Sequence, residues 1–462
     1  MSIKLNSVPE WVRDSIFYQI FPERFENGDP SNDPSGVEAW GGTPKSGNFF
    51  GGDLRGIINR MQYLKDLGIT ALYLNPIFEA TTNHKYNATD YKKIDPSFGT
   101  NELFTDFITT CHANGIKVVL DGVFNHVGVN HFAFQDVVKN GAQSQYASWF
   151  NVYSYPVSSP RHPNYECWWG IGSLPKLMVQ NPAVKEYLFS VARFWTGKID
   201  GWRLDVPDEI PHEFWKEWRK VVRDVNPDCY IVGELWFDAS PWLKGDEFDA
   251  TMNYRFRSAC LDYFAHDALT PSQFLNRLEK VRSSYTADHN FAMLNLLDSH
   301  DTERFLTLAG KDTWRVKQAS LFQMTYLGAP MVYYGDEIGM EGGKDPDCRR
   351  CMVWETSRWN DELLSHYRTL IDIRKRSVAL RRGSFTVLST DDNQGLMIYK
   401  RSGFGQNAYI VINNSNAQTA VKIPVDRADG EGQDAVTEET FSIHQNVMSV
   451  DVPEKSGRIF LM

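Results

Sequence analysis

The chain alternates short apolar runs, rich in β-branched and aromatic residues, with longer stretches whose apolar residues recur at helical spacing. The runs predicted to be strands are residues 15–21, 69–75, 117–124, 201–206, 230–235, 250–254, 292–297 and 330–334. Helical patterns follow most of them, at residues 54–68, 101–115, 184–195, 213–225, 271–281 and 313–326. A strand–helix unit repeated about eight times predicts a parallel (β/α)8 barrel, or TIM barrel. A doubly wound open sheet is the alternative, but the glycine-rich phosphate loop that usually follows its first strand is missing.

Two segments interrupt this alternation and set the predicted domain boundaries. Residues 125–181 are rich in Gly, Pro, Ser, Tyr and Trp, show no clear helix and follow the third strand. They are predicted to form an irregular subdomain inserted into a βα loop. From residue 383 the pattern changes to short alternating runs, which predicts an antiparallel β domain at 383–462. The barrel then comprises residues 1–124 and 182–382.

Charge and composition exclude several classes of partner. The 462 residues carry a net charge of −10 without a basic stripe, which argues against nucleic-acid binding. The N-terminal segment MSIKLNSVPEW lacks a leader pattern and no run of about 18 apolar residues occurs, so we expect a cytoplasmic protein with no membrane partner. The six cysteines are too few for a disulfide framework. The single C-x-x-C pair, Cys348 and Cys351, lacks the second pair that a zinc site needs.

Acidic residues recur at the carboxyl ends of the predicted barrel strands, where barrel enzymes have their active sites. An aspartate after a strand is usually a helix cap or a turn residue, so each of these residues alone is weak evidence. Acidic side chains gathered at one rim of a barrel repel one another, which raises the free energy of the folded state. Their presence at several strand ends therefore indicates a functional role. The acidic residues are Asp121 at the third strand, Asp205 at the fourth, Glu234 at the fifth and Asp301 at the seventh. Arg203 and His300 stand beside them at the fourth and seventh strands.

Two carboxyl groups in different protonation states are what hydrolysis of a glycosidic bond requires: an acid for the leaving oxygen and an anion facing the anomeric carbon. Arg203 and Asp205 are two residues apart on a strand and share a face, so we expect the guanidinium to hold Asp205 ionised as a nucleophile. Glu234 has no such adjacent cation and stands beside Leu235 and Trp236. These neighbours favour its protonated form and a role in general acid/base catalysis.

At these positions the sequence resembles the α-amylase family of glycoside hydrolases. DGVFNH, GWRLDVPDE, GELW and SHDTER are similar to four short regions typical of that family, in the same order and on the expected strands. A finer resemblance is to its neopullulanase, cyclomaltodextrinase and maltogenic amylase group. That resemblance rests on YQIFPERFENGDPSNDP, FFGGDL, TNHKYNATDY, LPKL and GGKDPDCRRCMVW, and it extends over nearly the whole chain.

The resemblance implies a retaining hydrolase that forms a covalent glycosyl-enzyme, with Asp205 as nucleophile, Glu234 as acid/base and Asp301 as the carboxylate that stabilises the transition state. The implied substrates have α-1,4 and some α-1,6 glucosidic bonds: maltooligosaccharides, cyclodextrins, pullulan or starch, with a capacity for transglycosylation. The implied substrate-binding residues are His126, Arg203 and His300 at the innermost subsite, His84 and Tyr86 at the scissile glucose, Trp236 and Glu209 on the acceptor side, and Asp345 and Arg349 at the outer donor subsites. Taken singly, each histidine has a structural hydrogen bond as its alternative role.

A structural calcium ion is also implied, because NGDPSNDP and the later GGD resemble a calcium loop of this group. Oxygen-bearing residues clustered in a turn rich in Gly and Pro suit Ca2+. The alternative is an Asn/Asp turn held by its own side-chain hydrogen bonds. The candidate ligands are Asn27, Asp29, Asn32, Asp33, the Gly51 carbonyl and Asp53.

The sequence departs from this group at its start, because the first predicted strand begins at about residue 15 and leaves no room for the extra N-terminal β domain that many members carry. That domain builds their dimer and narrows their active site, so we expect a monomer or homodimer with a more open cleft. Three other functions stay open. One is a sucrose- or trehalose-type transferase of the same family, against which the motifs of the finer group argue by resemblance. A debranching enzyme favouring α-1,6 branches would release maltotriose from pullulan, whereas neopullulanase-like enzymes release panose. A catalytically inactive amylase-like binding protein would lack the carboxylates that this chain keeps.

Overall fold

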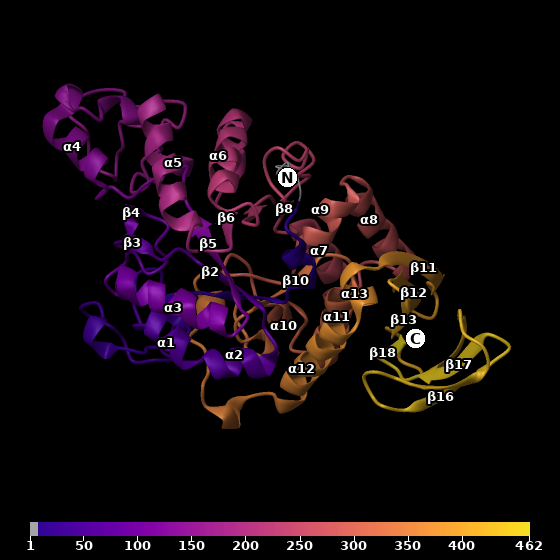
Figure 1. Cartoon of the computed structure of the whole chain (residues 1–462). Coiled ribbons are helices and arrows are strands. Elements are labelled where there is room, and N and C mark those ends of the chain that lie inside the picture. Colours follow the sequence, from indigo (N-terminus) through magenta and orange to yellow (C-terminus); the bar gives the residue numbers. More distant parts are fainter. Residues whose placement is uncertain (1–7) are drawn as a thin grey trace.

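A parallel barrel of eight strands forms the centre of the molecule (Figure 1). The structure is a computed structural model and describes residues 8–462; residues 1–7, which hold most of the N-terminal segment discussed above, lie outside the described residues. Each predicted apolar run contains one barrel strand. In chain order these strands are β1 Phe17–Ile20, β2 Ala71–Leu74, β5 Lys117–Gly122, β6 Gly201–Leu204, β7 Tyr230–Gly233, β8 Ala250–Thr251, β9 Leu294–Leu296 and β10 Ala329–Tyr333.

The strand order shows why this sheet is a barrel and not an open sheet. The strands are hydrogen-bonded in the order β8-β7-β6-β5-β2-β1-β10-β9. A further parallel bridge between Met252 and Leu294 joins the two ends of that order. The strand residues are buried, apart from Lys117 at the start of β5, as expected for strands covered by helices outside and packed side chains inside. The predicted (β/α)8 barrel is confirmed.

Helices surround the barrel, and local sequence signals set several of their ends. Asp53 accepts a hydrogen bond from the Gly56 amide and begins α1, and Gly68 at φ 91° ends α2 in the left-handed conformation that glycine tolerates. The single helix predicted at 54–68 is broken at Arg60 into these two. The helices outside the inserted segment are α1 Leu54–Asn59, α2 Met61–Leu67, α3 Asn101–Ala113, α5 Pro182–Thr196, α6 His212–Val225, α7 Tyr254–Cys260 continued by a π-helical turn Leu261–Ala265, α8 Pro271–Ser283, α9 Ala287–Ala292, α10 Phe305–Leu308, α11 Thr313–Thr325, α12 Asp361–Arg376 and α13 Val378–Arg382.

The segment inserted after β5 contains a helix that the sequence prediction lacked. Helix α4, Phe132–Asn140, begins where His131 Nδ1 accepts a hydrogen bond from the Ala133 amide, and it buries Phe134 and Val137 on one face. The expectation of a segment without helix was therefore wrong, because two buried positions one turn apart are too few to stand out among Gly and Ser. An antiparallel pair, β3 Phe78–Ala80 and β4 Ala88–Ile94, lies after β2 and was also not predicted.

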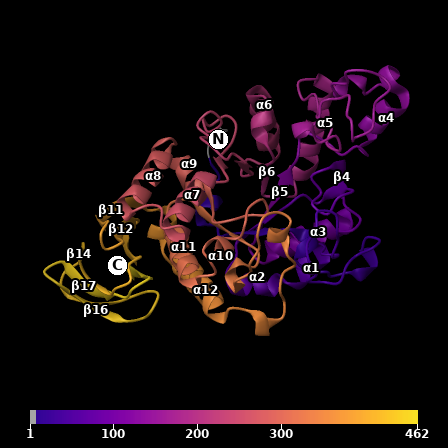
Figure 2. The ribbon, with the colours of Figure 1, turned by 180° about the vertical axis from the view of Figure 1, so that it is seen from behind.

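The C-terminal β region consists of two four-stranded antiparallel sheets. One sheet is β11 Ser384–Asp391, β12 Leu396–Gly403, β13 Gln406–Asn413 and β18 Ser456–Leu461; the other is β14 Thr419–Pro424, β17 Val447–Val452, β16 Thr440–His444 and β15 Gly430–Gln433. Leu396 and Ile398 of β12 pack between the sheets, whereas Met397 and Tyr399 pack against the main core. This alternation is the period of two expected of a strand buried on both faces. Figures 1 and 2 show these sheets at one end of the molecule and α4 at the other.

Residues 8–462 contain no membrane-spanning helix, no disulfide bond and no cluster of His, Cys, Asp and Glu that could hold a metal ion. No helix in that range is long and apolar enough to cross a membrane. The six cysteines of that range are free thiols, and no group of three or more His, Cys, Asp or Glu side chains there is arranged to hold a metal ion.

Candidate active site

The carboxyl ends of the barrel strands bring the predicted acidic residues to one rim of the barrel. Asp121 of β5 and Arg203 of β6 are direct register partners on neighbouring parallel strands. Asp205 follows β6, Glu234 follows β7, and Asp301 lies in the loop after β9. The convergence follows from the topology, because parallel strands end at the same rim of a barrel.

Arg203 is the cation around which three carboxyl groups gather. Its side chain is fully buried, and its Nη1 lies 2.8 Å from Asp121 Oδ1 and 2.9 Å from Asp205 Oδ1. Its Nη2 lies 2.9 Å from Glu234 Oε2. The expectation that Glu234 has no nearby cation was wrong, because the contact crosses between strands and cannot be seen from neighbours in the sequence. Asp205 and Glu234 are thus held by the two terminal nitrogens of one guanidinium.

Polar groups also surround Glu234. The Trp236 indole N–H donates to Glu234 Oε1 at 3.2 Å, and the Val206 amide donates to Oε2 at 3.3 Å. Trp236 therefore contributes a hydrogen-bond donor to Glu234, which its apolar character in the sequence did not suggest.

The balance of charge gives another reason for a proton in this cluster. Burial raises the pKa of Asp205 well above its ordinary value, and the charge of Arg203 opposes that shift without cancelling it. Burial likewise raises the pKa of Asp121 against the same cation. The predicted contact of Arg203 with Asp205 is present, but the guanidinium alone does not offset the effect of burial on the pKa of Asp205. One guanidinium thus faces several buried carboxyl groups, an arrangement that favours an added proton within the cluster and so suits acid/base chemistry.

His300 is fixed through both ring nitrogens. The Gln19 amide nitrogen lies 2.8 Å from His300 Nδ1 and donates to it, so the ring proton lies on Nε2. That nitrogen is 3.0 Å from Asp301 Oδ2 and 2.7 Å from the Tyr86 hydroxyl. Burial lowers the pKa of His300 well below its ordinary value, so the ring is neutral at pH 7. A neutral ring with this tautomer presents a donor toward Asp301.

Arg349 connects Asp301 to the predicted outer donor residue Asp345. Its Nη2 lies 3.2 Å from Asp301 Oδ1, its Nη1 lies 3.2 Å from Asp345 Oδ1, and its Nε donates to the His300 carbonyl at 2.8 Å. Burial raises the pKa of Asp301 to about 7. The charge of Glu234 adds to this shift, and the charge of Arg349 opposes it. Its side chain nevertheless keeps 28% of its surface exposed, so it remains accessible to a ligand.

Tyr86 and His84 lie against the same cluster. The Tyr86 ring stacks on His300 with centroids 5.6 Å apart and planes 5° from parallel, and its hydroxyl donates to Asp121 at 2.9 Å. The Tyr86 amide donates to His84 Nδ1 at 3.1 Å. Burial lowers the pKa of His84 to about 3, so this ring is neutral and can take part in hydrogen bonds at its remaining nitrogen.

His126 begins an aromatic stack that leads from the buried cluster to the surface. Its Nε2 is buried and has no hydrogen-bond partner among residues 8–462, which contrasts with a histidine satisfied by structural bonds. Its ring stacks on Trp168 at 5.4 Å, and Trp168 stacks on Trp169 at 4.9 Å. Trp169 is 80% exposed, yet its indole N–H donates to Glu209 Oε1 at 2.9 Å, which fixes the ring. Lys176 holds the other Glu209 oxygen at 3.1 Å.

Trp236 offers a second partly exposed aromatic surface beside Glu234. Its ring stacks on Tyr254 with centroids 3.6 Å apart and planes 9° from parallel, and the residue is 47% exposed. Of the two predicted acceptor-side residues, Glu209 therefore lies next to the exposed Trp169 ring, and Trp236 is itself an exposed ring packed on the buried Tyr254. The sequence reasoning missed Trp168, Trp169 and Gln19. The adjacent tryptophans in a loop rich in Gly and Pro were a signal for the first two.

The six calcium candidates lie together in the loop after β1 and at the start of α1. A Cβ atom on Gly51 would lie 2.2 Å from Asp33 Oδ1 and 2.4 Å from Asn27 Nδ2, so these groups pack directly against the glycine backbone. Asn27 Oδ1 and Asn32 Oδ1 are buried without hydrogen-bond partners among residues 8–462. Amide and backbone carbonyl oxygens are ligands that Ca2+ accepts, so the residues present fit that ion.

The turn alternative for this loop also has support. The Asp53 carboxylate accepts hydrogen bonds from the backbone amides of Gly28 at 3.2 Å, Asp29 at 2.9 Å and Gly56 at 2.6 Å. Asp29 Oδ1 in turn accepts from the Ser31 amide at 3.1 Å. These bonds hold the loop without a metal ion, although they leave the two asparagine oxygens unsatisfied.

Comparisons with known proteins agree with this geometry. A family model described as the alpha amylase catalytic domain matches residues 19–361. A cyclomaltodextrinase of Geobacillus thermopakistaniensis is 46% identical over 98% of this chain and 77% of its own length. Neopullulanase 2 of Thermoactinomyces vulgaris is 47% identical over 92% of this chain and 73% of its own length. Among solved structures, the cyclic alpha-maltosyl-(1→6)-maltose hydrolase of Arthrobacter globiformis superimposes with a TM-score of 0.91 and 41% identity, over 98% of this chain and all of its own.

Proposed function

Because this chain belongs to the alpha-amylase family of glycoside hydrolases, we propose that it is a retaining hydrolase of α-glucans. It cleaves α-1,4 and some α-1,6 glucosidic bonds in maltooligosaccharides, cyclodextrins, pullulan or starch, and it can transfer the glycosyl group to a second sugar. The names of the relatives support this range: one acts on cyclomaltodextrins, one is a neopullulanase, and one hydrolyses a cyclic maltosyl-(1→6)-maltose.

The shared guanidinium of Arg203 is the observation that carries the mechanism. Asp205 and Glu234 each lie 2.9 Å from one of its terminal nitrogens, so their carboxyl groups are near one another on the same rim. Retaining glycosidases need a separation of about 5–5.5 Å, whereas inverting enzymes need about 6.5–9.5 Å to admit a water molecule. A bridge by one planar group favours the shorter separation.

The reaction then proceeds in two displacements. Glu234 gives its proton to the glycosidic oxygen while an Asp205 oxygen attacks the anomeric carbon, so the C–O bond breaks and a glycosyl ester forms. Glu234, now ionised, takes a proton from water or from a sugar hydroxyl, and the resulting oxygen displaces Asp205. Asp301, held by Arg349 and His300, stabilises the positive charge that develops on the sugar ring.

The surrounding residues orient the sugar in this proposal. His126, His300 and Arg203 contact the glucose at the cleaved bond, His84 and Tyr86 border it, and Asp345 with Arg349 borders the donor chain. The unsatisfied His126 Nε2 supports such a role, because a sugar hydroxyl would complete its hydrogen bonding. On the acceptor side, Trp236 and Glu209 border the leaving sugar or the transfer acceptor, and the exposed Trp169 ring beside Glu209 extends that surface.

A structural calcium ion belongs to the proposal. The side-chain oxygens of Asn27, Asn32, Asp29, Asp33 and Asp53 and the Gly51 carbonyl would hold it, and the ion would neutralise the acidic loop. Two observations support it: the unsatisfied asparagine oxygens and the tight approach of Asn27 and Asp33 to Gly51. A cytoplasmic location is likewise proposed, since six free thiols suit a reducing compartment. Monomer and homodimer both remain compatible with the proposal.

A debranching enzyme that prefers α-1,6 branches is the second candidate. It is favoured by the similarity to a hydrolase whose name contains a (1→6) bond and whose whole chain is covered. A product profile on β-cyclodextrin, pullulan and amylopectin separates the two. Panose from pullulan, together with ring opening of β-cyclodextrin, supports the first function, whereas maltotriose from pullulan supports debranching. Absence of reducing-sugar release from all three substrates contradicts both.

A further inference from the structure

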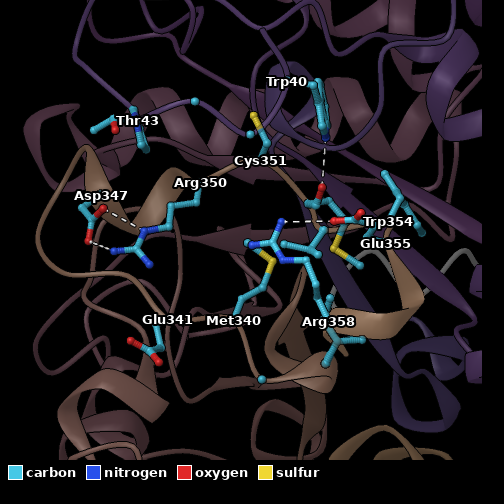
Figure 3. A pocket seen from close by; sticks show the side chains of 17 residues that line it. Trp40, Thr43, Met340, Glu341, Asp347, Arg350, Cys351, Trp354, Glu355 and Arg358 are labelled. Carbon is cyan, nitrogen blue, oxygen red and sulfur yellow. Dashed lines mark hydrogen bonds and ion pairs between the residues drawn. The ribbon is translucent and has the colours of Figure 1, made fainter. Parts of the chain in front are cut away.

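A cavity of about 720 Å3 opens between the loop after β1 and the loop after β10 (Figure 3). Its walls include Trp40, Met340, Glu341, Asp347, Arg350 and Trp354. None of the proposed catalytic or sugar-binding residues lines it. Its volume is within the range of about 300–1,000 Å3 typical of small-molecule sites. We propose that this cavity is a second α-glucan-binding site, outside the catalytic centre, and this inference rests on the proposed function.

Trp40 supplies the aromatic wall of the cavity. Its indole N–H donates to the Met352 carbonyl at 3.1 Å, which fixes the ring at the loop surface. Among residues 8–462, no aromatic or cationic side chain stacks on it, and the residue is partly exposed. A fixed, partly exposed ring in the wall of a cavity suits the apolar C–H face of a sugar.

Trp354 shows the contrast with a structural tryptophan. The Arg60 guanidinium lies 4.0 Å above its ring, and the edges of Phe25 and Tyr63 contact it with centroids 5.1 Å away. Its indole N–H donates to the Phe25 carbonyl at 2.7 Å. Trp354 is therefore occupied by protein on its faces, and Trp40 is the ring left for a ligand.

The charged residues around the cavity are all paired, which points to a neutral, hydroxyl-rich ligand. Arg350 binds both oxygens of Asp347, at 2.8 and 2.7 Å, and Arg358 lies 3.6 Å from Glu355. Glu341 lies 2.8 Å from Lys311. Both arginines of the lining are paired with carboxylates, which leaves no free cation there to bind a phosphate, and the paired groups present many donors and acceptors for hydroxyl groups.

The cavity is a close neighbour of the active site. Arg349 and Arg350 are adjacent in the chain at the 3-10 turn Asp347–Arg349, yet Arg349 contacts Asp301 whereas Arg350 lines the cavity. A polymer or long oligosaccharide could therefore contact both places at once. We expect the second site to assist catalysis on long glucans and to have no effect on maltotriose.

The test compares Trp40→Ala with Trp40→Phe and with Trp314→Ala as a matched control. Trp314 is a partly exposed tryptophan of α11 that does not line the cavity. Binding is measured in the inactive Glu234→Gln background by retardation in gels containing amylopectin, and kcat/KM is measured in the active background for amylopectin and maltotriose. We expect Trp40→Ala to weaken retardation and to lower kcat/KM for amylopectin by roughly three- to tenfold, the loss of one aromatic contact.

The other arms decide between a binding site and a structural residue. Trp40→Phe keeps a ring and should restore most of the retardation, and Trp314→Ala should behave like the parent. The second site would be overturned if Trp40→Ala and its parent were retarded equally. It would also be overturned if kcat/KM of Trp40→Ala fell equally for maltotriose and amylopectin while its thermal unfolding stayed unchanged. If the unaltered enzyme cleaves no α-glucan, the proposed function fails instead, and the two failures are thus distinguishable. Diffraction from Glu234→Gln crystals soaked in maltoheptaose should show sugar over Trp40.

Discussion

Replacing Arg203 with methionine should destabilise the protein in a manner that depends on pH. The guanidinium is fully buried and lies within 2.9 Å of carboxylate oxygens of Asp121, Asp205 and Glu234. Removing one partner of a buried ion pair costs about 3–5 kcal/mol, because the remaining charge is left without compensation. The buried carboxyl groups reduce that cost by taking up protons, so the loss is smallest at low pH.

The sign and size of the pH dependence follow from proton uptake. Without Arg203 the pKa values of Asp121 and Asp205, which burial already raises, rise further in the folded state, whereas in the unfolded chain they stay at about 4. Between pH 5 and pH 7 the folded variant keeps protons that the unfolded chain has released, so its free energy of unfolding falls as pH rises. For each additional proton that the folded variant keeps, its free energy of unfolding falls by a further ~1.4 kcal/mol per pH unit. Between pH 5 and pH 7 this amounts to about 2.7 kcal/mol.

Urea unfolding followed by tryptophan fluorescence at pH 5, 6 and 7 measures this effect against the unaltered protein. Arg374→Met is the matched control, because Arg374 is also fully buried but donates to the backbone carbonyls of Met324, Tyr326, Leu380 and Gly328. Its destabilisation should be nearly constant over this range, since no carboxylate loses its partner. If the deficit of Arg203→Met is as flat as that of Arg374→Met, the account of the carboxylate cluster is refuted.

Three further variants or treatments test other parts of the account. Glu234→Gln should lower kcat by roughly 10²–10⁴-fold with unchanged thermal unfolding, because it removes the proton donor; near-normal turnover would contradict the role of Glu234. Trp169→Ala should raise KM for long acceptors by roughly two- to tenfold and reduce the share of transfer products seen by chromatography, with kcat for hydrolysis of maltotriose nearly unchanged. Chelation by EDTA should lower the Tm of the unaltered protein and leave that of Asn32→Ala unaffected, since that variant loses a proposed ligand; a calorimetric scan that shows no response in either would exclude the calcium site.

The sequence was sufficient for the barrel but overestimated how far some strands extend. The apolar run 201–206 predicts a strand through Val206, yet β6 ends at Leu204 and Val206 adopts a left-handed backbone at φ 35°. That turn directs the chain away just after Asp205 and leaves this side chain at the rim. Patterning detects burial and not such turns, so the end of the strand could only be seen in three dimensions.

Electrostatics was the part of the site that local sequence could not predict. The pairing of Arg203 with Asp205 was visible at a spacing of two residues, whereas its contact with Glu234 crosses from one strand to the next. The strength of burial at Asp205 was equally hidden, and it reverses the expected direction of the pKa shift. The aromatic stack of His126, Trp168 and Trp169 also joins segments separated in the chain.

Identification of the residue that carries the glycosyl group tests the central claim most directly. The Glu234→Gln variant, incubated with a 5-fluoro α-glucosyl fluoride, can still form an ester with its nucleophile but has lost the base that activates water for release. Digestion and tandem mass spectrometry then locate the added sugar. The account predicts a glucosyl adduct on Asp205, in the peptide that contains residues 201–206. An adduct on Asp301 or on any other side chain, or rapid turnover without an adduct, would contradict it.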